Sequence, residues 1–190
     1  MDDLKSRLDK IYGRVTSNEF LSGESLSGEI PFYAFDYPPK KEVRVREHVG
    51  FLISQIAKKR PEIRIAHVNL LELAIDHLRE RKLYDKALEL QSAKGNDAAM
   101  GALKAPLDAG RIATVFVKKI KPEENDLVFV TGVGSSYPLL RTHSLLNNLH
   151  PKMGKTPLIF FYPGVYDQQS LKLFGKLKDK SYYRAFRLVD

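Results

Sequence analysis

The sequence predicts one α/β domain over residues 1–190, a three-layer, Rossmann-like fold in which helices flank a mostly parallel sheet. Short apolar runs alternate along the chain with longer segments of helical periodicity, as in βα repeats. The short runs are apolar throughout, which is typical of strands covered on both faces. A chain of 190 residues is also long enough to bury a core without disulfides or metals.

The N-terminal elements follow from apolar spacing and from breakers. Three apolar residues at helical spacing predict a helix over residues 2–14, namely Leu4, Leu8 and Ile11. Residues 17–29 are rich in Ser and Gly, so residues 1–30 are expected to form a helix and a mobile loop. An apolar strand is predicted over residues 32–37. Pro38 and Pro39 end it and suit the start of a helix that runs to Pro61.

The central elements alternate in the same way. A strand is predicted over residues 63–68, and Asn69 is a suitable N-cap for a helix over residues 70–81. A second helical stretch covers residues 83–90, and residues 94–97 form a polar break. Residues 98–119 predict one helix or a broken pair, with Pro106 and Gly110 as candidate interruptions.

The C-terminal part contributes two strands and a helix before the last strand. Strands are predicted over residues 127–130 and 157–162, with a helix over residues 139–149 between them. Residues 183–189 predict a final strand. It could be antiparallel, because little sequence separates it from Tyr162 for a helical crossover.

Composition excludes several classes of protein. Apolar residues make up 43% and charged residues 28% of the chain, as in ordinary globular domains. The absence of cysteine excludes disulfides, zinc–thiolate sites and thiol nucleophiles. The charged N-terminus lacks the apolar core of a signal peptide, and no apolar run reaches membrane-spanning length. We therefore expect a cytoplasmic protein without membrane contact.

The net charge of +8 is concentrated in the C-terminal part. Residues 1–109 carry 18 Lys and Arg against 17 Asp and Glu, whereas residues 110–190 carry 13 against 6. The densest basic run consists of Lys172, Lys176, Lys178, Lys180, Arg184 and Arg187. Such a run attracts phosphate backbones or acidic protein surfaces. A solvated basic face is the simpler interpretation, because no known nucleic-acid motif accompanies it.

Motifs for nucleotides and metals fail in detail. A Walker A loop follows a strand and has two glycines, the second followed directly by a lysine. Gly23 and Gly28 have the required spacing, but Glu29 stands in place of the lysine, and the stretch precedes a strand. A dinucleotide fingerprint needs a third small residue where Tyr137 stands. The five histidines show no metal-binding spacing. We therefore expect neither a cofactor nor a metal.

Two turns after strands form the candidate site. The first, D-L-V-F-V-T-G-V-G-S-S-Y, joins a strand to a helix and exposes backbone amides that suit an anion or a polar partner group. The second covers residues 162–167. In a parallel sheet both would open on one edge and form a crevice, which Asp36 could join. The candidate residues are Thr131, Gly132, Gly134, Ser135, Ser136, Tyr137, Arg141, His143, Asn147, Tyr166 and Asp167.

A hydrolytic site is a minor alternative. Ser136, His143 and Asp167 are the residue types of a catalytic triad, but no G-x-S-x-G elbow is present. Serine in such a turn more often caps the following helix. We therefore expect no catalytic residue and a protein that is not an enzyme.

Four sequence blocks, in this order, resemble the BrxB family. They are F-Y-A-F-D-Y-P-P at 32–39, T-G-V-G-S-S-Y-P-L-L-R-T-H-S-L-L-N-N-L at 131–149, F-F-Y-P-G-V-Y-D-Q-Q-S-L-K-L-F-G-K-L-K-D at 160–179 and Y-Y-R-A-F-R-L at 182–188. The resemblance implies a core component of BREX, the system that restricts phage while methylating host DNA. It implies an α/β protein without assigned catalytic activity, acting beside a PglZ-type protein of the alkaline-phosphatase superfamily, a methyltransferase and a large ATPase.

Three functions follow, in order of preference. The first is a non-enzymatic adaptor that docks the PglZ-type protein through the two turns and nearby tyrosines, which are Tyr137, Tyr166, Tyr182 and Tyr183. The second is a subunit that contacts nucleic acid through the basic run. The third is a nucleotide or anion sensor with the amides of residues 132–136 as its cradle.

Overall fold

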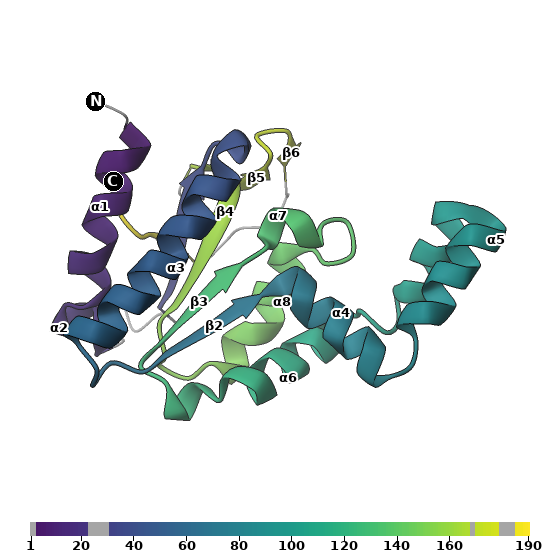
Figure 1. Ribbon diagram of the computed structural model, residues 1–190, viewed down its shortest axis with the longest axis horizontal. Coiled ribbons are helices and arrows are strands. Elements are labelled where there is room, and N and C mark those ends of the chain that lie inside the picture. Colours follow the sequence, from purple (N-terminus) through teal and green to yellow (C-terminus); the bar gives the residue numbers. More distant parts are fainter. Residues whose placement is uncertain (1–2, 23–30, 168–169, 179–184) are drawn as a thin grey trace.

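The computed structural model describes residues 3–22, 31–167, 170–178 and 185–190 (Figure 1). The helices within these ranges are α1 (Asp3–Val15), α2 (Asn18–Leu21), α3 (Glu42–Lys59), α4 (Leu70–Glu80), α5 (Tyr84–Leu103), α6 (Ala109–Ile120), α7 (Val133–Ser136) and α8 (Thr142–Leu149), with 3₁₀ turns η1 (Pro39–Lys41), η2 (Pro122–Glu124) and η3 (His150–Lys152). The strands are β1 (Phe32–Tyr37), β2 (Ile65–Asn69), β3 (Leu127–Thr131), β4 (Leu158–Tyr166), β5 (Leu171–Leu173), β6 (Leu177–Lys178) and β7 (Phe186–Arg187).

The predicted three-layer α/β fold is confirmed. Strands pair in parallel in the order β2-β3-β4-β1-β7, and β5 and β6 add antiparallel pairs beyond β4. In Figure 1, α1 and α3 lie on one face of the sheet, and α4, α6 and α8 lie on the other. Strand residues alternate between the two cores. Phe160 packs with the α4–α6–α8 layer, whereas Phe161 packs with the α1–α3 layer.

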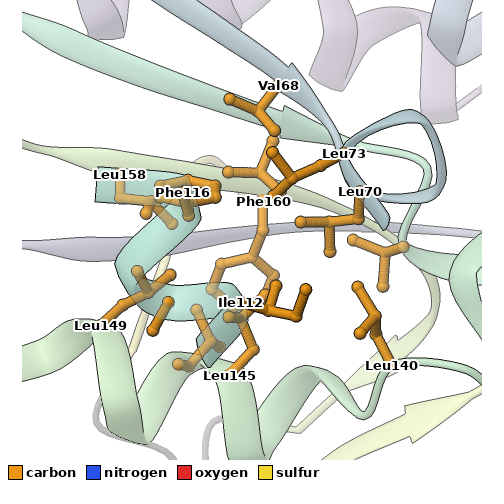
Figure 2. Close-up of a cluster of buried hydrophobic side chains, with 14 of the residues drawn as sticks. Val68, Leu70, Leu73, Ile112, Phe116, Leu140, Leu145, Leu149, Leu158 and Phe160 are labelled. Atoms are coloured by element: carbon orange, nitrogen blue, oxygen red, sulfur yellow. The ribbon is translucent and has the colours of Figure 1, made fainter. Parts of the chain in front are cut away.

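The larger core lies under α4, α6 and α8 (Figure 2). Ile112 and Phe116 of α6 and Phe160 of β4 are almost completely buried there. Asp108 begins α6, where its Oδ1 accepts hydrogen bonds from the amides of Gly110 and Arg111. Gly110 therefore lies inside α6 and does not interrupt it, whereas Pro106 precedes the helix.

Three boundaries in the first half differ from the predictions. Residues 17–29 do not begin as a loop, because Ser17 caps the short helix α2 through the amide of Phe20, which is buried. The predicted strand at residues 63–68 begins at Ile65. The polar break at residues 94–97 is a kink at Gly95, with φ of 83°, that divides α5 into two helical halves. Residues 23–30, the rest of the predicted loop, lie outside the described residues.

Three further corrections concern the C-terminal part. The helix predicted from residue 139 begins at Thr142. The turn predicted at residues 162–167 is the continuation of β4, which reaches Tyr166 and pairs with β5. Gly164 is needed there for close approach, because a Cβ atom would lie 2.2 Å from the carbonyl oxygen of Lys172. The last strand, β7, is parallel to β1 and not antiparallel, and the described part of the segment between β4 and β7 contains the β5–β6 hairpin.

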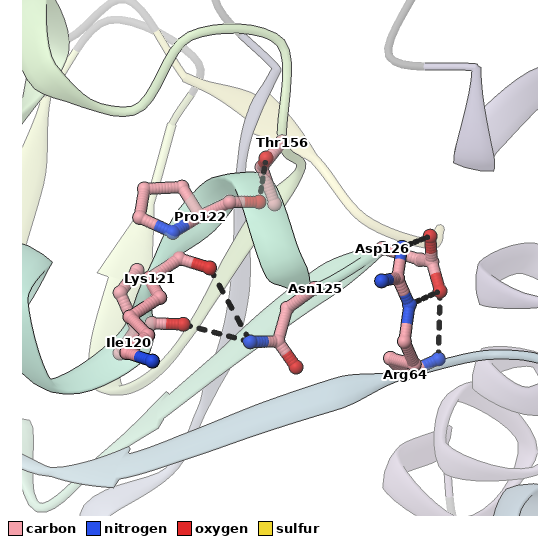
Figure 3. A network of polar contacts seen from close by, with 7 residues as sticks. All are labelled: Arg64, Ile120, Lys121, Pro122, Asn125, Asp126 and Thr156. Atoms are coloured by element: carbon pink, nitrogen blue, oxygen red, sulfur yellow. Dashed lines mark hydrogen bonds and ion pairs between the residues drawn. The ribbon is translucent and has the colours of Figure 1, made fainter.

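Polar contacts fix the amino-terminal edge of the sheet (Figure 3). The Asp126 carboxylate accepts from the backbone amide of Arg64 at 2.7 Å and from its guanidinium at 3.0 and 3.1 Å. Asn125 Nδ2 donates to the carbonyl of Ile120 at 2.7 Å, and Thr156 Oγ1 donates to that of Pro122 at 2.8 Å. The hydrogen bonds from Arg64 lower the pKa of Asp126. This edge is structural, and the candidate residues lie at the opposite edge.

Candidate functional site

Asp36 lies one residue before the carboxyl end of β1, and its carboxylate already has partners within the fold. Its Oδ1 lies 2.7 Å from the Arg7 guanidinium of α1, and its Oδ2 accepts from the amide of Tyr166 at 3.0 Å. Arg7 also donates to the carbonyl of Asp36 at 2.8 Å. Asp36 therefore ties α1 and β4 to β1.

The Gly-rich turn after β3 is packed tightly. Gly132 has φ of 70°, and a Cβ atom there would lie 2.1 Å from Oδ1 of Asn69. That oxygen caps α4, accepting from the amide of Leu71 at 3.0 Å, as predicted for Asn69. A Cβ atom at Gly134 would lie 2.8 Å from Pro163. Both glycines therefore have a packing role in this turn.

The serines and Thr131 of this turn differ in exposure. Ser136 is buried, and its hydroxyl donates to the carbonyl of Val133 at 2.9 Å, whereas Ser135 is exposed. Thr131 Oγ1 lies 2.9 Å from Nε2 of His67 on the neighbouring strand. Loss of solvent around the His67 ring lowers its pKa, and the nearby Glu72 carboxylate opposes that shift.

The triad residues make separate contacts. Ser136 bonds to its own turn, His143 lies 3.2 Å from Oγ of Ser144, and Asp167 accepts from the amide and hydroxyl of Ser170. Ser136 and Asp167 thus bond within their own turns, and His143 lies beside its neighbour in α8.

Two of the four predicted tyrosine anchors lie within the described residues, and they differ in exposure. Tyr137 is 36% exposed and stacks edge to face on Phe174 with centroids 6.4 Å apart. Tyr166 is only 1% exposed, because its ring lies in the core and its hydroxyl donates to the carbonyl of Ala185. The expectation that Tyr166 presents a surface for docking is therefore wrong. Tyr182 and Tyr183 lie outside the described residues.

The basic run is partly used within the fold. Arg187 donates to the carbonyl of Tyr166, and the Lys172 ammonium lies 3.6 Å from the Asp167 carboxylate. Lys176 is exposed. Lys180 and Arg184 lie outside the described residues, as does the side chain of Lys178.

Sequence reasoning missed a groove between α4 and α5. It has a volume of about 470 Å³ and lies beside the segment that follows the Gly-rich turn. In Figure 1, α5 stands away from the sheet and forms the outer wall. Its apolar lining consists of Leu71, Ile75 and Leu78 from α4, Tyr84, Ala87, Leu88, Ala99, Met100 and Leu103 from α5, and Pro138 and Leu139.

The two polar lining residues of this groove share one hydrogen bond. Gln91 Nε2 donates to Oδ1 of Asn96 at 2.8 Å across the kink at Gly95. Leu88 is 46% exposed at the rim. The Arg79 guanidinium lies 4.9 Å from the Tyr84 ring centroid and fixes the start of α5 beside α4.

Arg141, His143 and Asn147 do not form one cluster with the glycines. Arg141 precedes α8, is exposed, and lines a second cavity of about 500 Å³ beside the groove. Asn147 is exposed and His143 is half-buried. Arg141 thus lines the cavity beside the groove and is not among the residues that line the groove itself.

Two further observations on the described residues concern membranes and metal ions. Among them, no helix is long and apolar enough to cross a membrane. Within the same ranges, no group of three or more His, Cys, Asp or Glu side chains could hold a metal ion.

Comparison with known proteins identifies the family. The family model described as BREX protein BrxB matches residues 66–188. The chain belongs to the BrxB family. A BREX protein BrxB from Bacillus cereus (strain H3081.97) is 38% identical over 192 residues, covering all of both chains. Another from Escherichia coli O9:H4 (strain HS) is 36% identical over 98% of this chain and 92% of the relative. No solved structure matches the chain. As a BrxB protein it is a component of the BREX phage-defence system.

Proposed function

We propose that this protein is a non-enzymatic adaptor of its BREX complex and that it binds the PglZ-type protein. The observation that carries the proposal is the apolar groove between α4 and α5. Its apolar lining is mostly half-buried, with Leu88 and Pro138 exposed and Leu78 and Ala99 buried. A groove of this character favours protein contact over catalysis, because apolar side chains make up most of its lining.

The sequence block at residues 131–149 connects the groove with the family resemblance. Pro138 and Leu139 close one end of the groove, and Arg141 lies just beyond them. The adaptor proposal thus rests on a surface built partly from a segment by which the family is recognised.

The alternatives receive less support from the contacts. Two residues of the basic run have partners within the fold, which weakens the nucleic-acid proposal. The Arg187 guanidinium donates to the Tyr166 carbonyl, and the Lys172 ammonium lies beside the Asp167 carboxylate. The anion-sensor proposal relies on a turn in which Gly134 contacts Pro163 and Ser136 is buried. The nucleic-acid proposal remains an outcome of the experiment below.

The test is co-purification with the PglZ-type protein of the same system, followed by size-exclusion chromatography with light scattering. Nuclease treatment and moderate salt exclude bridging by DNA. The proposal predicts a discrete complex of defined mass. If the protein elutes alone while it binds DNA in a salt-dependent way, the nucleic-acid proposal replaces it.

A further inference from the structure

The groove between α4 and α5 continues into a second cavity. The apolar cavity of about 470 Å³ and its neighbour of about 500 Å³ share four lining residues, Met100, Leu103, Pro138 and Leu139. The two therefore form one trough, which runs from α4 along the second half of α5 toward α6 and α8. We call it the α5 trough.

The two ends of the α5 trough differ in chemistry. The α4 end is lined by apolar side chains, whereas Lys104 and Arg141 line the α8 end. The acid at that end, Asp108, uses Oδ1 to cap α6. An occupant that complements the trough is therefore apolar along most of its length and acidic at one end.

The walls favour a helical occupant. They are built from side chains of α4 and α5, whose backbone groups are bonded within their own helices, so an extended peptide would find no sheet edge to pair with. A helix satisfies its own backbone and needs only side-chain contacts. A small polar ligand would meet mainly apolar side chains at the α4 end, where Gln91 and Asn96 are the polar lining residues.

We propose that the α5 trough receives an amphipathic helix of a partner protein. Apolar side chains spaced i, i+4 and i+7 fill the α4 end, and a carboxylate one turn further lies beside Arg141 and Lys104. This rests on the proposed function, in that the partner is another protein of the BREX complex. The helix-in-trough mode is the new element.

Two pairs of variants test the trough. Leu88→Glu places a charge at its apolar rim, and Phe51→Glu is the matched control on α3, where Phe51 is 61% exposed in the opposite layer. Arg141→Glu reverses the charge at the other end, and Arg46→Glu, at an exposed position of α3 in the opposite layer, is its control. All four side chains are exposed, so the variants are expected to fold, which circular dichroism checks.

The variants are co-expressed with the PglZ-type protein, the methyltransferase and the large ATPase of the same system. Leu88→Glu and Arg141→Glu should each weaken complex formation about tenfold or more, and the two controls should leave it within about twofold of wild type. A photo-crosslinking amino acid in place of Met100 should attach to a partner segment with apolar residues at helical spacing and a flanking acid.

The outcomes separate the two proposals. If all four variants retain the PglZ-type protein equally, the proposal that a partner helix binds in the α5 trough is wrong, while the adaptor proposal stands. If Leu88→Glu and Arg141→Glu lose a different component, the trough is supported and the PglZ-type partner is not. Crosslinks to an extended segment or to a second copy of the chain overturn the helical occupant. If the wild type retains none of the components, both proposals fail.

Discussion

The ion pair between Arg7 and Asp36 gives the sharpest stability prediction. Their side chains are 13% and 12% exposed, and the two charged atoms lie 2.7 Å apart. Asp36 also accepts from the amide of Tyr166. Replacing Asp36 with alanine therefore leaves a largely buried guanidinium without its counter-charge and a buried amide without its acceptor.

The cost of Asp36→Ala follows from that geometry. Removing one partner of a buried ion pair destabilises a protein by about 3–5 kcal/mol. For a chain of this length each kcal/mol lowers Tm by about 2–4 °C, so Tm should fall by about 6–20 °C. Glu19→Ala is the matched control, because the Arg14–Glu19 pair is 3.6 Å long and Glu19 is 71% exposed. Its expected cost is below about 1 kcal/mol.

Urea unfolding followed by circular dichroism measures both variants. The double variant Arg7→Met, Asp36→Leu removes both charges and should recover part of the loss, since the guanidinium is then no longer buried alone. It should not recover all of it, because the Tyr166 amide still lacks its acceptor. If Asp36→Ala costs no more than Glu19→Ala, the pair does not hold α1 to the sheet and the reasoning is refuted.

Two further predictions concern the turn after β3 and the polar edge. Gly132→Ala should destabilise the fold by more than about 2 kcal/mol, since its Cβ atom meets Asn69, whereas Gly154→Ala, with φ of 59° and open space, should cost only about 1–2 kcal/mol in chemical denaturation. Equal costs would mean that the contact with Asn69 is not tight. Asp126→Ala should cost about 1 kcal/mol at neutral pH, where its carboxylate bonds Arg64. Because the folded-state pKa of Asp126 is lowered, this contribution is complete above the ordinary pKa of about 3.9 and is lost as pH falls through the lowered value. Wild-type and variant stabilities should therefore converge in acid, and a constant difference would contradict that role.

The sheet was predictable from the sequence because its strands are buried on both faces. Residues 32–37 and 127–130 are apolar runs with clear breakers, and the structure forms strands there. Asn69 was predictable as a cap, since its side-chain oxygen is the group that a helix start requires. Pro163 and Gly164 led to the wrong prediction of a turn. Both residue types are common in turns, but here they serve close packing around β4 and β5.

The candidate site was predictable only in part. The Gly-rich turn drew attention to the segment that supplies Leu139 and Arg141. The α5 wall was missed, because its apolar residues are separated by polar ones and lie far along the chain from α8. Leu88 and Met100, apolar residues on either side of the predicted polar break, were the available signal. The prediction of a turn at residues 162–167 places Tyr166 at the surface. Tyr166 is buried instead, because β4 continues to this residue and pairs with the antiparallel strand β5.

The most direct test of the central claim is hydrogen–deuterium exchange of the protein alone and in its complex with the PglZ-type protein. The account predicts that exchange slows in α5 and at residues 137–141 on binding, while α1 and α3 are unchanged. Slowing confined to the β5–β6 hairpin, with α5 exchanging as in the free protein, would contradict docking through the α5 trough.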